Sequence, residues 1–362
     1  MSPDGPTRDA AAAEASRANA AWRQTLRLAL ALALSFTIGE AQDQTFAFLT
    51  ALFAVQMLAK SPDMPSLKQG FGFALIMSVA ALAALTLAGI LLHKPVAYLL
   101  VMGILVFGCF QLQARGKGGP VPQLLLICSV ALPVIAQQST DLALAFTAIM
   151  VEAAIGAPLV VWLVHAILPT TAMPAARASP PPMADASDGL LRRSLLATLV
   201  LLLPFAWYMM HPNAASIVIL ITCIGILGQA PALQLRTAGG LLLGNLIGGV
   251  AASLAYLAVT LLPSLVLLFL VCLLAGIVLA ARLYSPSPLA PVYAIALTTF
   301  LILLGTGLAP IGDGSAVAFI ARLADVALAS LYAIGAIILF RAAGAAAHKS
   351  EPPSPPGEKA HA

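Results

Sequence analysis

The sequence predicts an all-α polytopic membrane protein, and two observations lead to this prediction. Hydrophobic residues make up 61% of the 362-residue chain and charged residues only 9%, against roughly 25% charged in an average soluble domain. The apolar residues also form long continuous blocks, and about 20 apolar residues let a helix cross the bilayer core. These features exclude a soluble globular enzyme, and they exclude a β-barrel, whose strands would alternate apolar and polar residues.

Each half of the chain contains six apolar blocks, so we expect twelve transmembrane helices. The first half has blocks at 24–39, 44–59, 70–92, 96–114, 121–138 and 142–168. The second half has blocks at 193–210, 213–229, 238–262, 264–281, 289–309 and 315–341. Because the first two blocks of each half are short, a re-entrant pair and ten or eleven crossings are the alternative.

The two halves match in the order of their basic, proline and acidic residues. Lys60-Ser-Pro62 corresponds to Gln229-Ala-Pro231, and Arg115 corresponds to Arg282. An ordered series of this kind predicts an internal duplication. We expect two parallel six-helix repeats at 23–168 and 192–341, joined by a Pro- and Ala-rich linker at 169–191. Polar tails at 1–22 and 342–362 are expected to be disordered.

Basic residues are concentrated on one side of the predicted membrane. With six crossings in each half, 16 of the 18 Lys and Arg residues fall on the side that holds both termini and the linker. Only Lys94 and Arg322 fall elsewhere. Positively charged loops stay in the cytoplasm. We therefore predict a multi-pass protein of the bacterial inner membrane with both termini and the linker in the cytoplasm.

Motifs for enzymatic or cofactor chemistry are missing from the sequence. It contains no phosphate-binding loop, no nucleophile elbow and no basic patch interleaved with aromatic residues. The four cysteines lie far apart inside apolar blocks, and the five histidines are scattered, so no metal-ligand spacing occurs. We predict no enzyme activity, no catalytic residue, no cofactor, no metal and no nucleic-acid partner.

Three charged residues lie at mid-membrane depth in the predicted helices. Glu152 lies 11 residues beyond Asp141, and Asp325 lies 12 residues beyond Asp313. Arg322 precedes Asp325 by three residues and so shares its helix face. An ionised side chain at the bilayer centre costs at least about 2.5–3.5 kcal/mol, so such residues pair or line a pathway. Arg322 and Asp325 are either a structural ion pair or a transport site, and Glu152 is the better proton-carrier candidate.

A run of small residues begins the third block of the second half. Gly240, Gly244 and Gly248 recur every four residues after Arg236, which lets another helix approach one face closely. Helix packing is the first interpretation of this run. The alternative is that Asn245 presents its amide to a cavity.

These motifs resemble those of the fusaric acid resistance and aromatic acid exporter superfamily. The resemblance rests on Arg236 with its spaced glycines, on a degenerate copy at Lys68-Gln-Gly70-Phe-Gly72, and on Arg322-Leu-Ala-Asp325. It implies an inner-membrane pump that expels aromatic carboxylic acids with a periplasmic adaptor of the membrane-fusion class. The chain lacks the large cytoplasmic domains of longer members and resembles the compact class still labelled as a domain of unknown function.

The sequence and this resemblance together predict an efflux permease for small, amphipathic, anionic compounds, driven by protons. Arg322 would attract the substrate carboxylate, while Glu152 and Asp325 would carry protons. The alternatives are a passive anion channel and a non-transporting membrane scaffold of an envelope complex. The expected partners are the substrate, the adaptor and the lipid bilayer. An outer-membrane channel and a homo-oligomer are left open.

Overall fold

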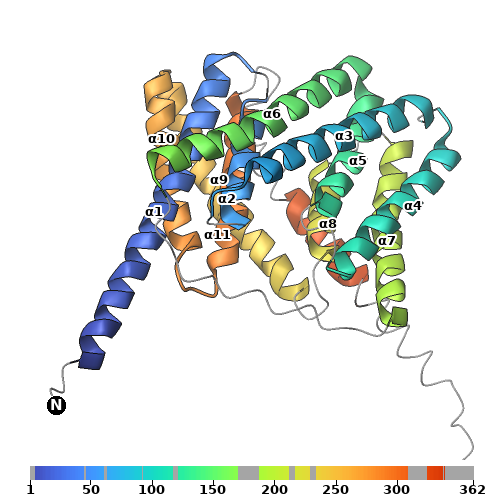
Figure 1. Ribbon diagram of the computed structural model, residues 1–362. Coiled ribbons are helices and arrows are strands. Elements are labelled where there is room, and N and C mark those ends of the chain that lie inside the picture. The colour runs from blue at the N-terminus through green and yellow to red at the C-terminus, as the bar shows by residue number, and fades with distance from the viewer. Residues whose placement is uncertain are drawn as a thin grey trace, which may run out of the picture.

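The computed structural model describes residues 5–44, 46–60, 63–91, 93–116, 121–169, 187–211, 217–228, 234–308, 324–336 and 338. All regular secondary structure in these residues is helical, which confirms the predicted all-α fold (Figure 1). The labelled helices are α1 (Gly5–Ala41), α2 (Phe48–Lys60), α3 (Leu67–Leu91), α4 (Pro95–Ala114), α5 (Val121–Gln138), α6 (Thr140–Ile167), α7 (Ser187–Met210), α8 (Ile217–Leu227), α9 (Gln234–Leu261), α10 (Leu265–Leu283) and α11 (Ala290–Leu308). A further apolar helix covers Ala324–Ala336.

Seven helices in the described part of the chain are long and apolar enough to cross a bilayer. These spans are Leu67–Leu91, Pro95–Ala114, Thr140–Ile167, Gly189–Met210, Gly239–Leu261, Leu265–Leu283 and Ala290–Leu308. Their surfaces fit a lipid environment, because large side chains such as Leu75, Leu254 and Leu274 are more than half exposed. A water-exposed surface of this composition would be unfavourable. The chain is therefore a multi-pass α-helical membrane protein.

The N-terminal segment corrects one prediction. We expected residues 1–22 to be disordered, but α1 begins at Gly5 and continues without a break to Ala41. The segment is rich in alanine, which has the highest intrinsic helix propensity, and it extends the apolar helix that follows. At the predicted linker, residues 187–191 are already part of α7. Residues 170–186 and the predicted tail at 342–362 lie outside the described residues.

The first two helices of each half pack against helices of the other half, an arrangement that we call the crossed packing. α1 packs along α10 and α2 contacts α11, while α7 packs along α4 and α8 contacts α5 (Figure 1). Within each half, the third helix packs against the fifth, as α3 does with α5 and α9 with α11. Each of these contacts in one half has a counterpart in the other. The first two helices of each half thus pack against the opposite half.

Two hydrophobic cores follow this crossed pattern. The first core joins residues of α1, α2, α3 and α6 to residues of α9, α10 and α11. The second core joins α4, α7, α8 and the helix Ala324–Ala336. α5 contributes to both, with Leu132 in the first and Leu126 in the second. Because each core draws on both halves of the chain, neither half buries its apolar surface without the other.

Candidate functional site

Two short helices occupy corresponding positions in the two halves. α2 has 13 residues and the described part of α8 has 11, or about 20 Å and 17 Å at 1.5 Å per residue, whereas the hydrocarbon core is about 30 Å thick. Short hydrophobic segments at matching positions of a repeat are a pointer to a transporter's binding site. The residues around the C-terminal ends of α2 and α8 are therefore the first place to look for a site.

At the end of α2, the junction with α1 and α10 is closed by hydrogen bonds. The Tyr284 hydroxyl donates to the backbone carbonyl of Leu58 at 3.1 Å. In α1, the side chain of Arg27 is only 3% exposed. Its Nε donates a hydrogen bond to the Leu168 carbonyl and its Nη2 donates one to the Pro169 carbonyl, each with a donor–acceptor distance of 2.7 Å. These carbonyls follow α6, so the guanidinium satisfies acceptors that a helix C-terminus leaves free.

Arg27 gives a test of this closed junction. We expect Arg27→Met to destabilise the protein by about 2 kcal/mol, because two hydrogen bonds from a charged donor are lost and the two carbonyl groups lose this donor. The matched control is Arg23→Met, one turn earlier at an exposed position, which should change stability by less than about 0.5 kcal/mol. Thermal unfolding of the purified proteins in detergent measures the difference. Equal stability of the two variants would contradict the role given to Arg27.

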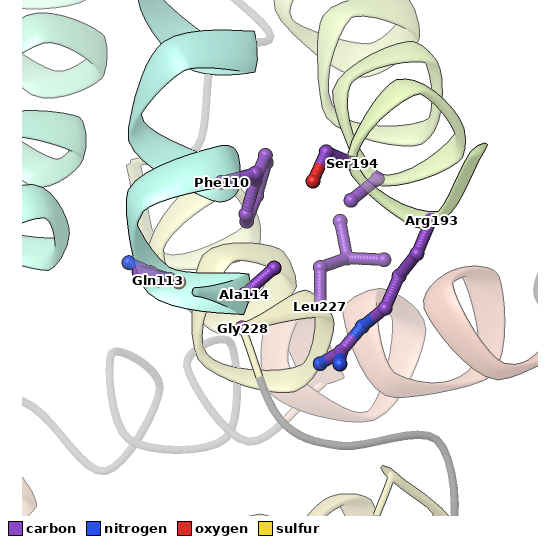
Figure 2. Close-up of a pocket in the computed structure, with 8 residues that line it drawn as sticks. Phe110, Gln113, Ala114, Arg193, Ser194, Leu227 and Gly228 are labelled. Carbon is purple, nitrogen blue, oxygen red and sulfur yellow. The ribbon is translucent and has the colours of Figure 1, made fainter. Parts of the chain in front are cut away.

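At the end of α8, the corresponding junction with α7 and α4 contains a small gap. A pocket of about 10 Å³, with room for roughly one water molecule, lies between the three helices (Figure 2). We call it the α4–α7–α8 pocket, and its lining residues are Phe110, Gln113, Ala114, Arg193, Ser194, Ala197, Leu227 and Gly228. Ser194 is 1% exposed, and its hydroxyl has no hydrogen-bond partner within the described part of the chain.

The α4–α7–α8 pocket has an apolar wall and a polar edge. Figure 2 shows the Phe110 ring and Leu227 on either side of the space, with the Ser194 oxygen turned toward it and the Arg193 guanidinium reaching down along its edge. α4 and α8 meet closely at its base, where a Cβ added to Gly228 would lie 2.8 Å from Gln113 Oε1. The two junctions thus occupy corresponding places in the crossed packing. The first is closed by hydrogen bonds, and the second contains a small pocket.

Glu152 lies halfway along α6, with its side chain on the outer surface. It is exposed, about 18 Å from the first residue of the helix and about 22 Å from the last. Ile155 and Leu159 continue the same face and are 51% and 56% exposed. α6 contains no Lys or Arg, so no cation on its own helix can neutralise this carboxylate. The structure thus places an ionisable group within an apolar, outward-facing stripe.

The predicted Arg322–Asp325 motif is only partly visible. Arg322 lies outside the described residues, so its side chain is not placed. Asp325 is the second residue of the helix Ala324–Ala336, and it is half-buried. This helix contributes Ala329 and Ala333 to the second core, whereas α6 contributes to the first. The two acidic candidates, Glu152 and Asp325, therefore belong to different cores.

The spaced glycines of α9 lie along its contact with α11. A Cβ added to Gly244 would lie 2.7 Å from Ile295 Cβ, and one added to Gly248 would lie 2.9 Å from Thr299 Cβ. Gly240 is less confined, since its nearest neighbour would be Val292 Cγ2 at 3.6 Å. Arg236 is part of α9, but its side chain lies outside the described set.

Asn245 joins the same two helices by hydrogen bonds. Its Nδ2 donates to the Leu241 carbonyl at 2.7 Å, and its Oδ1 accepts from the Thr299 hydroxyl at 3.0 Å. The amide is therefore used within α9 and across to α11. This geometry fits the packing interpretation of the segment better than the cavity interpretation.

Sequence reasoning did not single out the residues of the two junctions. Arg27 looked like an ordinary flanking residue of the first apolar block, and Ser194 looked like one of many small residues. The signal that could have found them was the shortness of the second block in each half, combined with the Arg residues that precede the first block of each half.

Among the comparisons with known proteins, one found a match. A model of a family described as a protein of unknown function, DUF2955, matches residues 24–164. The matched segment runs from α1 to near the end of α6. No curated protein and no solved structure matches the chain.

Proposed function

We propose that the protein is a proton-driven efflux permease of the bacterial inner membrane for small amphipathic carboxylates, and that it is not an enzyme. The observation that carries this proposal is Glu152, an ionisable carboxyl group midway along the 28-residue apolar helix α6. A charge at this depth costs at least about 2.5–3.5 kcal/mol in lipid, and intramembrane acids commonly serve as proton relays. Glu152 is well suited to bind and release a proton as its surroundings change.

The remaining parts of the proposal come from the sequence and its resemblance to the fusaric acid resistance and aromatic acid exporter superfamily. Asp325 would be a second proton site, and Arg322 would attract the substrate carboxylate. The resemblance also implies a periplasmic adaptor of the membrane-fusion class.

The proposed orientation has a direct test. Reporter fusions after Ala184 should report the cytoplasm and fusions after His93 should report the periplasm, because the basic residues concentrate on the side of the linker. Paired alkaline phosphatase and fluorescent-protein fusions at each site measure this. A periplasmic linker would contradict both the orientation and the parallel arrangement of the repeats.

Weak-acid resistance tests the proposed activity in cells. A deletion strain should become more sensitive to hydroxybenzoate-like acids, and more so at low external pH, because the protonated acid diffuses in and its anion is trapped. Expression of the protein with an adaptor should restore growth, and expression of the adaptor alone is the control. Unchanged sensitivity to every acid tested, with the protein and adaptor both confirmed in the membrane, would favour a scaffold.

A further inference from the structure

The outer face of α6 differs from the other outward-facing surfaces of the described helices. Among the seven membrane spans in the described part of the chain, only α6 has a charged residue more than two turns from either end, and that residue is Glu152. By contrast, Leu254 of α9 and Leu274 of α10 are 64% and 63% exposed, as lipid-facing residues are expected to be. Charged groups inside a membrane face protein or water and pair with other polar groups. Contact with protein therefore explains the face around Glu152 better than contact with lipid does.

Exposed residues on both sides of Glu152 have the spacing of a helix–helix seam. Five exposed residues of α6 are separated alternately by three and four positions, and we call this surface the α6 seam: Ala145, Ala148, Glu152, Ile155 and Leu159. Side chains with this spacing fit between those of a second helix that crosses at about 20°. The small side chains of Ala145 and Ala148 let that helix approach closely. The seam extends over about 21 Å, which is most of the thickness of the hydrocarbon core.

A second copy of the chain would complete the surroundings of Glu152. No hydrogen bond or ion pair joins its carboxyl group to another residue in the described part of the chain. When a two-fold axis along the membrane normal relates two copies, each interface residue lies at the same depth as its counterpart. The two Glu152 side chains then meet near the axis, where a protonated carboxyl group donates a hydrogen bond to the carboxylate of the other copy. Such a pair holds one negative charge in place of two.

We propose that the α6 seam is the interface of a homodimer in which the two Glu152 carboxyl groups share a proton across the axis. Ala145 and Ala148 allow the two α6 helices to approach, and Ile155 and Leu159 pack against their counterparts. The dimer concerns the same residue as the proposed proton pathway, but it rests on the exposure and spacing of the seam and not on transport. It gives an outward-facing carboxyl group a polar partner away from lipid.

Disulfide cross-linking of the full-length protein in native membranes tests the dimer. The four native cysteines are buried, so Ala148→Cys introduces the accessible thiol. Oxidation with copper phenanthroline should convert most of this variant into covalent dimers, because the two copies of residue 148 lie opposite each other at the axis. The matched control is Leu274→Cys, which should stay monomeric. Leu274 is exposed and is the tenth residue of α10, whereas Ala148 is the ninth residue of α6.

The charge at position 152 gives a second measurement. Glu152→Lys places two positive charges beside each other at the axis, so the affinity of the dimer should fall at least about tenfold. Glu152→Gln should keep the dimer, because an amide both donates to and accepts from its counterpart. Light scattering of the purified proteins in detergent measures their masses. An unchanged dimer in Glu152→Lys would overturn the pairing at the axis. Because neither measurement involves transport, failure of the proposed function and failure of the dimer are separate results.

Other occupants of the α6 seam give different results, and each would overturn the proposal. If the seam faces lipid, Ala148→Cys stays monomeric and reacts fully with a lipid-soluble maleimide. If a segment of the same chain covers the seam, the thiol neither cross-links nor reacts. If a different protein covers it, the product has a mass other than twice that of the chain, and the purified protein is monomeric. Equal cross-linking of Leu274→Cys would show that the products arise from random collisions.

Discussion

Glu152→Gln should reduce transport of a labelled aromatic acid to the level of empty membranes, at least about tenfold below wild type. The amide has nearly the same shape as the carboxyl group, but it cannot take up and release a proton. Stability should be unchanged or slightly raised, because a charge is removed from an apolar, outward-facing stripe. The measurement is the rate of efflux from loaded cells, with the amount of membrane-inserted protein determined in parallel.

Two further variants separate proton carrying from other effects at this position. Glu152→Asp keeps a titratable group at the same depth and should retain part of the activity. Asp141→Asn alters an exposed acid in the first turn of the same helix and should leave transport near the wild-type rate. Full activity of Glu152→Gln would remove this residue from the mechanism. If the anion then moved down its own electrochemical gradient at a rate independent of the proton gradient, the passive anion channel would be the better interpretation.

Gly248→Ala should lower stability much more than a methyl added at Gly239 or Gly240 of the same helix, α9. The new Cβ would meet the backbone carbonyl of Ala296 and lie 2.9 Å from Thr299 Cβ, and backbone cannot move aside as a flexible side chain can. Overpacking of this kind costs about 1–3 kcal/mol. Helices in lipid also depend on close contact for their association, so we expect a fall of several degrees in the melting temperature.

The same helix offers a matched control for this prediction. Gly240→Ala makes only ordinary contact with Val292 at 3.6 Å, and Gly239→Ala meets nothing within 4 Å. Both controls should be neutral or stabilising by up to about 1 kcal/mol, since alanine is the better helix former. Equal melting temperatures for Gly248→Ala and Gly240→Ala would show that the α9–α11 contact is looser than the structure indicates.

The sequence predicted the fold class and the positions of the apolar helices well, because continuous apolar blocks have few structural solutions in a bilayer. The prediction for α5, 121–138, coincides with the observed helix Val121–Gln138. The N-terminal segment was predicted wrongly, since polarity was taken as disorder where runs of alanine instead continue α1. Helix propensity outweighed the low hydrophobicity of this segment.

The crossed packing and the two junctions could not be predicted from one sequence. Apolar periodicity indicates which residues are in a helix, but in lipid it does not identify the neighbouring helix, because every face is apolar. The closed junction depends on Arg27 reaching carbonyls 141 and 142 residues away, and no local pattern encodes such a contact. By contrast, the position of Glu152 midway along an apolar helix could be predicted, since a lone carboxyl in an apolar block is visible in the sequence itself. Its role stays a prediction.

Purified protein in liposomes gives a direct test of the proposed proton-coupled transport. We expect an imposed pH gradient to accumulate a labelled hydroxybenzoate-like acid beyond the passive accumulation of the permeant protonated acid that protein-free liposomes show. A protonophore should abolish this accumulation, and Glu152→Gln should abolish it as well. Movement of the acid that stops at electrochemical equilibrium, whatever the pH gradient and with either residue at position 152, would contradict proton coupling.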